Sequence, residues 1–172
     1  MIISQLGGIE TISFPDHWCE RTIQDSVLRQ GVRAFHPQEN PQVRVCSVMA
    51  QVELSRPAQD ALQKILYEAF HTLTNAEVDS LSEILQAMSN PDAFSLESSA
   101  TGYLCDKRAL NVSGQWKGTM EQDLSFFVDL HGDGKWTQHI YYVGAPGDFE
   151  DYKTEANEIL QSIVWTRAVS TK

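Results

Sequence analysis

Apolar residues recur at helical spacing in three stretches of the chain, which predicts three helices. These stretches are residues 58–70, 74–88 and 149–163. Thr74 can form a capping box with Glu77 at the start of the second helix, and Asn90-Pro91 ends that helix. Asp148 is placed to cap the third helix. The pattern therefore predicts a helix pair in the middle of the chain and one helix near its end.

Strand-like alternation of apolar and polar residues marks most of the remaining chain. The predicted strands are residues 9–14, 27–36, 43–54, 94–98, 109–116, 122–130 and 136–143, with a short edge strand in 165–169. Segment 43–54 is apolar on both faces, which indicates either a central strand covered on each side or a strand with a bulge. The connector His131–Gly134 is too short for a parallel crossover, so the strands beside it are predicted to form an antiparallel hairpin. The predicted class is α+β, with an antiparallel sheet of about six to seven strands covered by helices.

Length and charge limit the classes of function. A chain of 172 residues fits one domain, residues 1–172, and a formal net charge of -10 disfavours binding to nucleic acid. No apolar stretch approaches the roughly 20 residues of a membrane span. No basic residue precedes Arg21, so we expect no secretory signal and a cytoplasmic location.

Residues of catalytic or metal-binding type are present but poorly arranged. His17 and Cys19 could face the same way on a strand, yet no second pair at metal-ligand spacing accompanies them. Cys105 would be a reactive thiol if Lys107 lowered its pKa. The chain has no nucleophile elbow, phosphate-binding loop or dinucleotide fingerprint. We therefore predict no metal, no cofactor and no enzymatic activity.

The segment Asp129–Gly134 is similar to the start of a calcium-binding loop but departs from that pattern. His131 stands where an oxygen ligand is needed, and Ile140 stands where a bidentate glutamate is needed. The prediction is a hairpin turn in which Asp133 and Gly134 take unusual backbone angles.

The order of predicted elements, together with motifs at both ends, resembles the PsbP-like superfamily of α-β-α sandwiches built on one antiparallel sheet. The motifs are Leu6-Gly7-Gly8 with Thr11, Phe14-Pro15 and Trp18; Gly114-Gln115-Trp116; His139-Ile140-Tyr141-Tyr142; and the helix leading from Phe149 to Trp165. Members of that superfamily include a Ran-GTPase-binding protein and chaperones of Rhs-type secreted effectors. The resemblance implies protein binding without a shared catalytic activity, and it carries over no functional residue.

Aromatic residues of the last hairpin are the candidate partner-binding residues. They are Phe127, Trp136, His139 and Tyr141. Either the sheet is buried on both faces, or a mixed aromatic and polar face is partly open, because the sequence does not fix the cross-strand register. Substituting Phe127 or Tyr141 by alanine would distinguish a core residue from a binding residue.

Two functions remain open from the sequence. The leading hypothesis is a non-enzymatic adaptor or chaperone that binds a protein partner and is able to form a homodimer. The alternative is a small-molecule-binding or hydrolytic domain, with a cleft between the last hairpin and the C-terminal helix and with His139 or Cys105 nearby.

Overall fold

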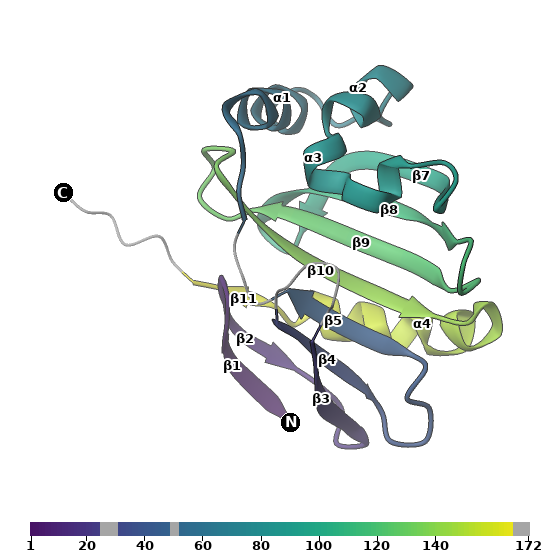
Figure 1. The fold of residues 1–172 in the computed structure, drawn as a ribbon. Helices are drawn as coiled ribbons and strands as arrows, with labels where there is room; N and C mark the ends of the chain where they lie inside the picture. Colours follow the sequence, from purple (N-terminus) through teal and green to yellow (C-terminus); the bar gives the residue numbers. More distant parts are fainter. Residues whose placement is uncertain (25–30, 49–51, 167–172) are drawn as a thin grey trace.

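A large antiparallel sheet separates two covering layers in the computed structural model (Figure 1), which describes residues 1–24, 31–48 and 52–166. Seven strands follow the order β3-β4-β5-β10-β9-β8-β7, and β6 pairs with β10 beside this path. Their bounds are β3 Trp18–Gln24, β4 Gly31–Pro37, β5 Arg44–Val48, β6 Val52–Glu53, β7 Phe94–Leu104, β8 Lys107–Trp116, β9 Gln122–Asp129 and β10 Trp136–Gly144. The predicted α+β class is confirmed, and β5 is a central strand as its two apolar faces indicated.

The predicted strands differ from the observed ones at β3 and β7, and parts of three predicted strands cannot be compared, among them residues 167–169 of segment 165–169, which lie outside the described residues. The first part of the predicted segment 27–36 and residues 49–51 of segment 43–54 lie outside the described residues. Strand β3 was not predicted. Strand β7 is longer than the predicted 94–98, and the prediction stopped early because the second half of the strand carries small and polar residues with weak alternation. These extra residues still pair fully with β8, so neighbouring strands supply the order that the local pattern lacks.

A second, three-stranded sheet was not predicted. Its order is β1 (Ile2–Leu6), β2 (Ile9–Ser13), β11 (Val164–Trp165). Gly7 and Gly8 join the first two strands, and Gly7 has a φ of 64°, which glycine adopts readily. A Gly-Gly pair between two alternating segments is a hairpin signal, so this strand pair could have been found in the sequence.

One face of the large sheet, the α4 face, is covered by helix α4 (Pro146–Gln161) and by the small sheet (Figure 1). Tyr142 of β10 stacks on Phe149 with 4.4 Å between ring centroids, and its hydroxyl donates to the Phe149 carbonyl oxygen at 2.6 Å. The helix begins after Ala145 with a proline in its first turn and no side-chain cap, so the predicted capping role of Asp148 is wrong. The α4 face is thus a continuous apolar core.

The opposite face, the α1–η1 face, is covered by short helices that lie above β7, β8 and β9 in Figure 1. They are α1 (Arg56–Tyr67), α2 (Asn75–Ser80), α3 (Ser82–Leu85) and the 3-10 helix η1 (Gln86–Ser89). The capping box of Thr74 and Glu77 is confirmed, but the predicted single helix 74–88 breaks at Leu81 and again at Gln86, where φ is 50°. Val78, Ile84 and Met88, from the three successive pieces, all belong to the apolar cluster beneath these helices.

The register of the last hairpin decides which of its side chains share a face. His139 pairs with Phe127, and Tyr141 pairs with Ser125. Because paired residues lie on the same side of a sheet, all four lie on the α1–η1 face. The antiparallel hairpin predicted from its short connector is confirmed.

Candidate functional site

A cavity of about 740 Å³ lies on the α1–η1 face, between the α3–η1 segment and strands β5, β8, β9 and β10. Its volume falls in the range of small-molecule sites, roughly 300–1,000 Å³. Most of its walls are apolar, including Val48, Leu54, Ile84, Leu85, Met88 and Trp116. The cavity therefore favours an apolar group as its occupant.

A chain of hydrogen bonds, which we term the polar chain, lies along the sheet at this cavity. Trp116 Nε1 donates to Asp123 Oδ2 at 2.9 Å, and the Ser125 hydroxyl donates to Asp123 Oδ1 at 2.6 Å. Ser125 Oγ also lies 2.9 Å from Nε2 of His139. Trp116, Asp123 and His139 line the cavity, whereas Ser125 is fully buried behind it.

The polar chain contains serine, histidine and aspartate but does not have the connectivity of a hydrolytic triad. In a triad the carboxylate orients the histidine, and the histidine accepts the serine proton. Here Asp123 accepts that proton directly, and the Ser125 side chain is 0% exposed, so no substrate carbonyl can reach it. Ser125 is therefore not placed as the nucleophile of such a triad.

Burial sets the protonation of the polar chain. It raises the pKa of Asp123 to about 6, against the opposing effect of the hydrogen bonds from Ser125 and Trp116. It lowers the pKa of His139 to about 3, because the ring is withdrawn from water without a carboxylate partner. At neutral pH the cavity therefore contains an ionised Asp123 and a neutral imidazole.

Three rings stack along this wall of the cavity. The His139 ring is stacked on the Phe127 ring, with 4.2 Å between centroids and an interplanar angle of 11°, and it lies 4.8 Å from the Tyr141 ring at a tilt of 31°. Burial raises the pKa of Tyr141 far above its ordinary value, and it raises the pKa of the neighbouring Cys46 thiol to about 12. Both groups are neutral at physiological pH, so this wall is uncharged.

Charged residues lie at the border of the cavity and are largely paired. Arg44 and Glu121 form an ion pair with 2.7 Å between Nη2 and Oε1. Glu83 accepts hydrogen bonds from the Ser55 backbone amide at 2.7 Å and from the Ser55 hydroxyl. The Arg44–Glu121 pair is neutral overall, whereas Glu83 is bonded only to neutral donors, and the acidic Asp92 also lines the cavity.

Three of the four predicted partner-binding residues come together at the cavity. Phe127, His139 and Tyr141 all line it, and Phe127 is also buried in the core beneath the helices. Trp136 does not join them, because strand alternation places it on the α4 face with Ile140. Sequence reasoning missed Asp123 and Trp116, whose contact depends on the pairing of β8 with β9.

The predicted cleft between the last hairpin and the C-terminal helix is absent from the described residues, and this prediction is wrong. Ile140 and Tyr142 of β10 pack there against Phe149 and Ala156 of α4 in one continuous cluster. His139 faces away from α4, so a ligand contacting it enters from the opposite side of the sheet.

Cys105 is not an activated thiol. Burial and the neighbouring Asp106 raise its pKa, and its Sγ donates to the Leu160 carbonyl oxygen at 3.4 Å. Lys107 donates instead to the Leu130 carbonyl oxygen at 2.6 Å. The hypothesis that Lys107 lowers the pKa of Cys105 is therefore wrong.

The turn after β9 is built around Asp129, which is buried. Its carboxylate accepts hydrogen bonds from the backbone amides of Gly132 and Gly134, at 3.0 and 3.1 Å, and from the Tyr67 hydroxyl at 3.2 Å. The two glycines have φ values of 76° and 69°, so the hairpin turn is confirmed, although Asp133 does not share this conformation.

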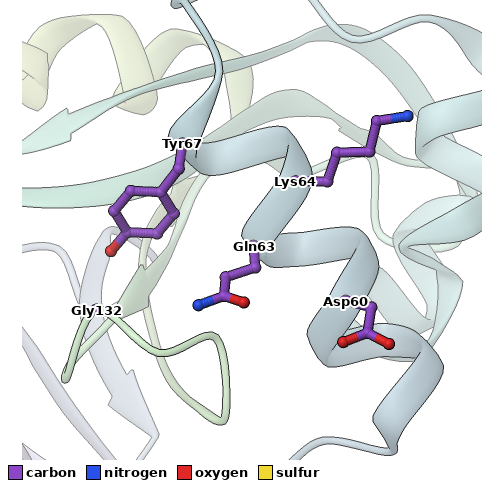
Figure 2. A pocket seen from close by; sticks show the side chains of 5 residues that line it. All are labelled: Asp60, Gln63, Lys64, Tyr67 and Gly132. Atoms are coloured by element: carbon purple, nitrogen blue, oxygen red, sulfur yellow. The ribbon is translucent and has the colours of Figure 1, made fainter.

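A second hollow, about 410 Å³ in volume, lies between α1 and this turn (Figure 2). Its lining consists of Asp60, Gln63, Lys64, Tyr67 and Gly132. All five residues are exposed to solvent. This hollow is a polar surface depression without convergent buried groups.

Side chains of metal-ligand type are occupied by other contacts. His17 Nε2 lies 3.1 Å from Glu155 Oε1, whereas Cys19 Sγ lies 3.5 Å from His36 Nε2, so His17 and Cys19 do not converge. Within the described ranges, the group of potential ligands close enough to share an ion is Glu68, His71 and Glu77.

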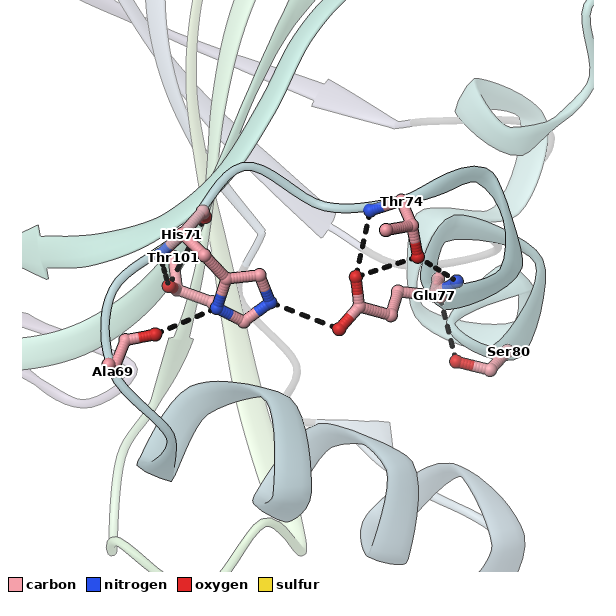
Figure 3. Close-up of polar contacts among 6 residues, drawn as sticks. All are labelled: Ala69, His71, Thr74, Glu77, Ser80 and Thr101. Atoms are coloured by element: carbon pink, nitrogen blue, oxygen red, sulfur yellow. Dashed lines mark hydrogen bonds and ion pairs between the residues drawn. The ribbon is translucent and has the colours of Figure 1, made fainter.

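Figure 3 shows how two members of this group stabilise the start of α2. His71 Nδ1 donates to the Ala69 carbonyl oxygen at 2.8 Å, and Nε2 lies 3.0 Å from the Glu77 carboxylate. The bond to Ala69 and then the one to Glu77 raise the pKa of His71, whereas the Thr74 bonds lower the pKa of Glu77 to about 2. This is a structural ion pair at a helix N-terminus.

Comparison with solved structures shows that the fold is PsbP-like. Cyanobacterial PsbP (CyanoP) from Synechocystis sp. PCC 6803 matches with a TM-score of 0.57 at 10% identity, over 96% of this chain and 92% of that chain. LpqN, which is involved in cell envelope biogenesis of Mycobacterium tuberculosis, matches with a TM-score of 0.56 at 12% identity, over 97% of this chain and 90% of that chain. No protein-family model and no curated protein sequence matches.

The resemblance read from the sequence motifs is thus confirmed at the level of the fold. At these identities the match shows the fold alone and assigns no function to the residues of the site. Among the described helices, none combines the length and the apolar composition needed to cross a lipid bilayer.

Proposed function

We propose that this chain is a non-catalytic binding protein that holds an apolar or amphiphilic small molecule in the cavity beneath α3 and η1. The observation that carries the proposal is the cavity itself, about 740 Å³ with mostly apolar walls. Covering apolar walls with an apolar ligand is favourable by roughly 25 cal/mol per Å² removed from water.

The polar groups support binding over catalysis. Ser125 is sealed and bonded to Asp123, and Cys46 and Tyr141 are neutral at physiological pH because burial raises their pKa values. None of these groups supplies a nucleophile or a general base to the cavity at neutral pH.

A fluorescence titration with N-phenyl-1-naphthylamine, a neutral apolar probe, tests this proposal. We expect saturable enhancement of probe fluorescence, lost in Ala93→Trp because Ala93 lines the cavity and is half-buried. Ala76→Trp is the matched control, since Ala76 is exposed on α2. Unsaturable fluorescence, or equal binding by both variants, would contradict the proposal.

A second candidate function, protein binding, is favoured by an exposed aromatic patch at the end of α1. Tyr67, Phe70 and Tyr103 are 46%, 49% and 51% exposed. The Arg108 guanidinium lies 5.0 Å from the centroids of the Tyr67 and Phe70 rings. Tyrosine and arginine are enriched in the residues that dominate protein interfaces.

Affinity capture from lysate with wild type and with Tyr103→Ala tests this second function. We expect a partner that wild type captures and the variant does not, with both proteins equally folded. Light scattering on the purified protein measures the expected homodimer, and a monomer that captures no protein would exclude both forms of protein binding.

A further inference from the structure

The positions of the protons along the polar chain determine which kind of ligand group can pair with His139. The Ser125 hydroxyl has one proton, and it points to Asp123 Oδ1, 2.6 Å away. The 2.9 Å contact between Ser125 Oγ and His139 Nε2 must therefore be donated by the histidine. This requires the neutral His139 tautomer that carries its proton on Nε2.

In that tautomer Nδ1 is a hydrogen-bond acceptor. Nδ1 has no hydrogen-bond partner among the described residues, whereas Nε2 is used by Ser125. In the described part of the chain, the side-chain atoms that are both shielded from solvent and without a hydrogen-bond partner are Asn111 Oδ1 and Gln122 Oε1. Nδ1 of His139 is not one of them, so it is not completely shielded. Because His139 lines the cavity, Nδ1 is accessible to a molecule bound there.

The other polar groups nearby do not compete for the same role. Each oxygen of Asp123 already accepts one bond, from Trp116 or from Ser125. Arg44 and Glu121 neutralise one another at the border. The Tyr141 hydroxyl lies beside the Cys46 thiol, and both remain neutral because burial raises their pKa values. Thr137 also lines the cavity with a hydroxyl that can donate or accept, so Nδ1 of His139 is the neutral side-chain group there that only accepts.

We propose that the cavity selects apolar molecules that carry a neutral hydrogen-bond donor, a hydroxyl or an amide N–H, which pairs with Nδ1 of His139. This inference rests on the proposed small-molecule function and specifies its ligand class. The stacked Phe127 ring and the tilted Tyr141 ring both contact the imidazole and restrict its orientation, so the acceptor is preorganised. A ligand carboxylate is disfavoured, since it would bring acceptor oxygens against Nδ1 and beside the carboxylate of Asp123.

Four compounds with an unbranched ten-carbon chain test the selection on the wild-type protein. They are 1-decanol, decyl methyl ether, decanoate and decylammonium, each used to displace N-phenyl-1-naphthylamine at about pH 7. We expect 1-decanol to bind about tenfold more tightly than the ether, although the ether is the more apolar, because only the alcohol donates a hydrogen bond. Equal or tighter binding of the ether or of decanoate would overturn the inference, and tighter binding of decylammonium would assign recognition to Asp123 instead.

The variant His139→Phe removes the acceptor while keeping a ring between Phe127 and Tyr141. We expect it to bind the alcohol and the ether with equal affinity. His131→Phe is the matched control, because His131 is exposed in the turn after β9, and it should retain the preference. A preference that survives in His139→Phe would contradict the role of Nδ1.

Nitrogen-15 chemical shifts of the His139 ring in the wild-type protein test the tautomer without any substitution. At about pH 7 we expect a protonated Nε2 and an unprotonated Nδ1, and the reverse tautomer would overturn the inference.

Failure of this inference is distinguishable from failure of the proposed function. If the naphthylamine probe itself does not bind, the cavity function fails; if it binds but the alcohol shows no preference, only the ligand class is wrong.

Discussion

The two faces of the central hairpin are built from alternate residues of the same strands, yet one face is filled and the other contains a cavity. On the α4 face, a helix of 16 residues and the three-stranded sheet cover the strands with one continuous cluster. On the α1–η1 face, three short helical pieces follow α1, and the cavity lies beneath the last two. Long, regular cover closes a face, whereas short, broken cover leaves space between its pieces and the sheet.

Gln138 on the α4 face and His139 on the α1–η1 face differ in how far their polar atoms are paired. On the α4 face, Gln138 accepts from the Gly8 amide at 2.6 Å and donates to Leu6 O and Ser47 Oγ, both at 2.9 Å. Its amide is fully used in connecting the two sheets. On the other face, the polar chain ends at His139 with a free acceptor in the described structure. The contrast concerns these two groups alone, because Asn111 Oδ1 and Gln122 Oε1 also lack a partner in the described structure, and Asn111 pairs with Phe126 of the α4-face cluster.

The largest effect is expected from Tyr142→Ala on the filled face. The side chain is 1% exposed and stacks on Phe149, so its removal should cost about 4 kcal/mol of unfolding free energy. Urea denaturation measures the loss. Tyr103→Ala, at an exposed tyrosine, is the control and should change stability by about 0.5 kcal/mol or less.

Tyr141→Ala, one residue earlier on the same strand, should cost less, about 1–2 kcal/mol. Tyr141 is only partly buried and already borders empty space, so its removal enlarges an existing cavity. The same urea experiment compares the two variants directly. A loss equal to that of Tyr142→Ala would show that the α1–η1 face is as tightly packed as the α4 face.

The pH dependence of stability tests the polar chain through Asp123→Asn. Between about pH 4 and 6, the raised pKa of Asp123 lets the folded state bind more protons than the unfolded chain, so acid stabilises through this group. The lowered pKa of His139 has the opposite effect on stability. The unfolded chain binds a proton at this histidine more readily than the folded protein does, so the folded state loses stability as the pH falls below about 6.5.

In wild type these two contributions oppose one another over the shared window. Asp123→Asn leaves only the histidine contribution, so its stability should fall more steeply than that of wild type between about pH 6 and 4. Thermal unfolding at several pH values gives the two curves. Parallel curves would mean that Asp123 and His139 are not buried as described.

The smallest effect concerns the thiols. Burial raises the pKa of Cys46 to about 12, so it should resist alkylation by iodoacetamide at about pH 8 until the protein unfolds. Cys19 is only partly buried and should be modified in the folded protein. Peptide mass spectrometry with and without urea locates the modified residues, and early modification of Cys46 would indicate that the face near Tyr141 is open to solvent.

The sequence identified much of this architecture because local patterns coincide with tertiary demands. The apolar stripe of the predicted helix 58–70 and the capping box at Thr74 are properties of single helices. The capping box is observed, and the stripe is observed as far as Leu66, whereas Ala69 and Phe70 lie beyond the end of α1 and are exposed. The hairpin around His131–Gly134 follows from the length of its connector. The break at Gln86 was not predictable in this way, because the helix is interrupted to place apolar residues against a sheet that is distant in sequence.

The candidate site shows the same division. The sequence by itself determined that Phe127, His139 and Tyr141 belong to strands with large side chains on both faces, since alternation is a local property. Only the tertiary structure decided that they face a cavity, that Trp136 lies on the other face, and that Asp123 and Ser125 join His139. Cross-strand register and the broken cover of α3 and η1 fix these contacts, and both arise from packing between segments far apart in the chain.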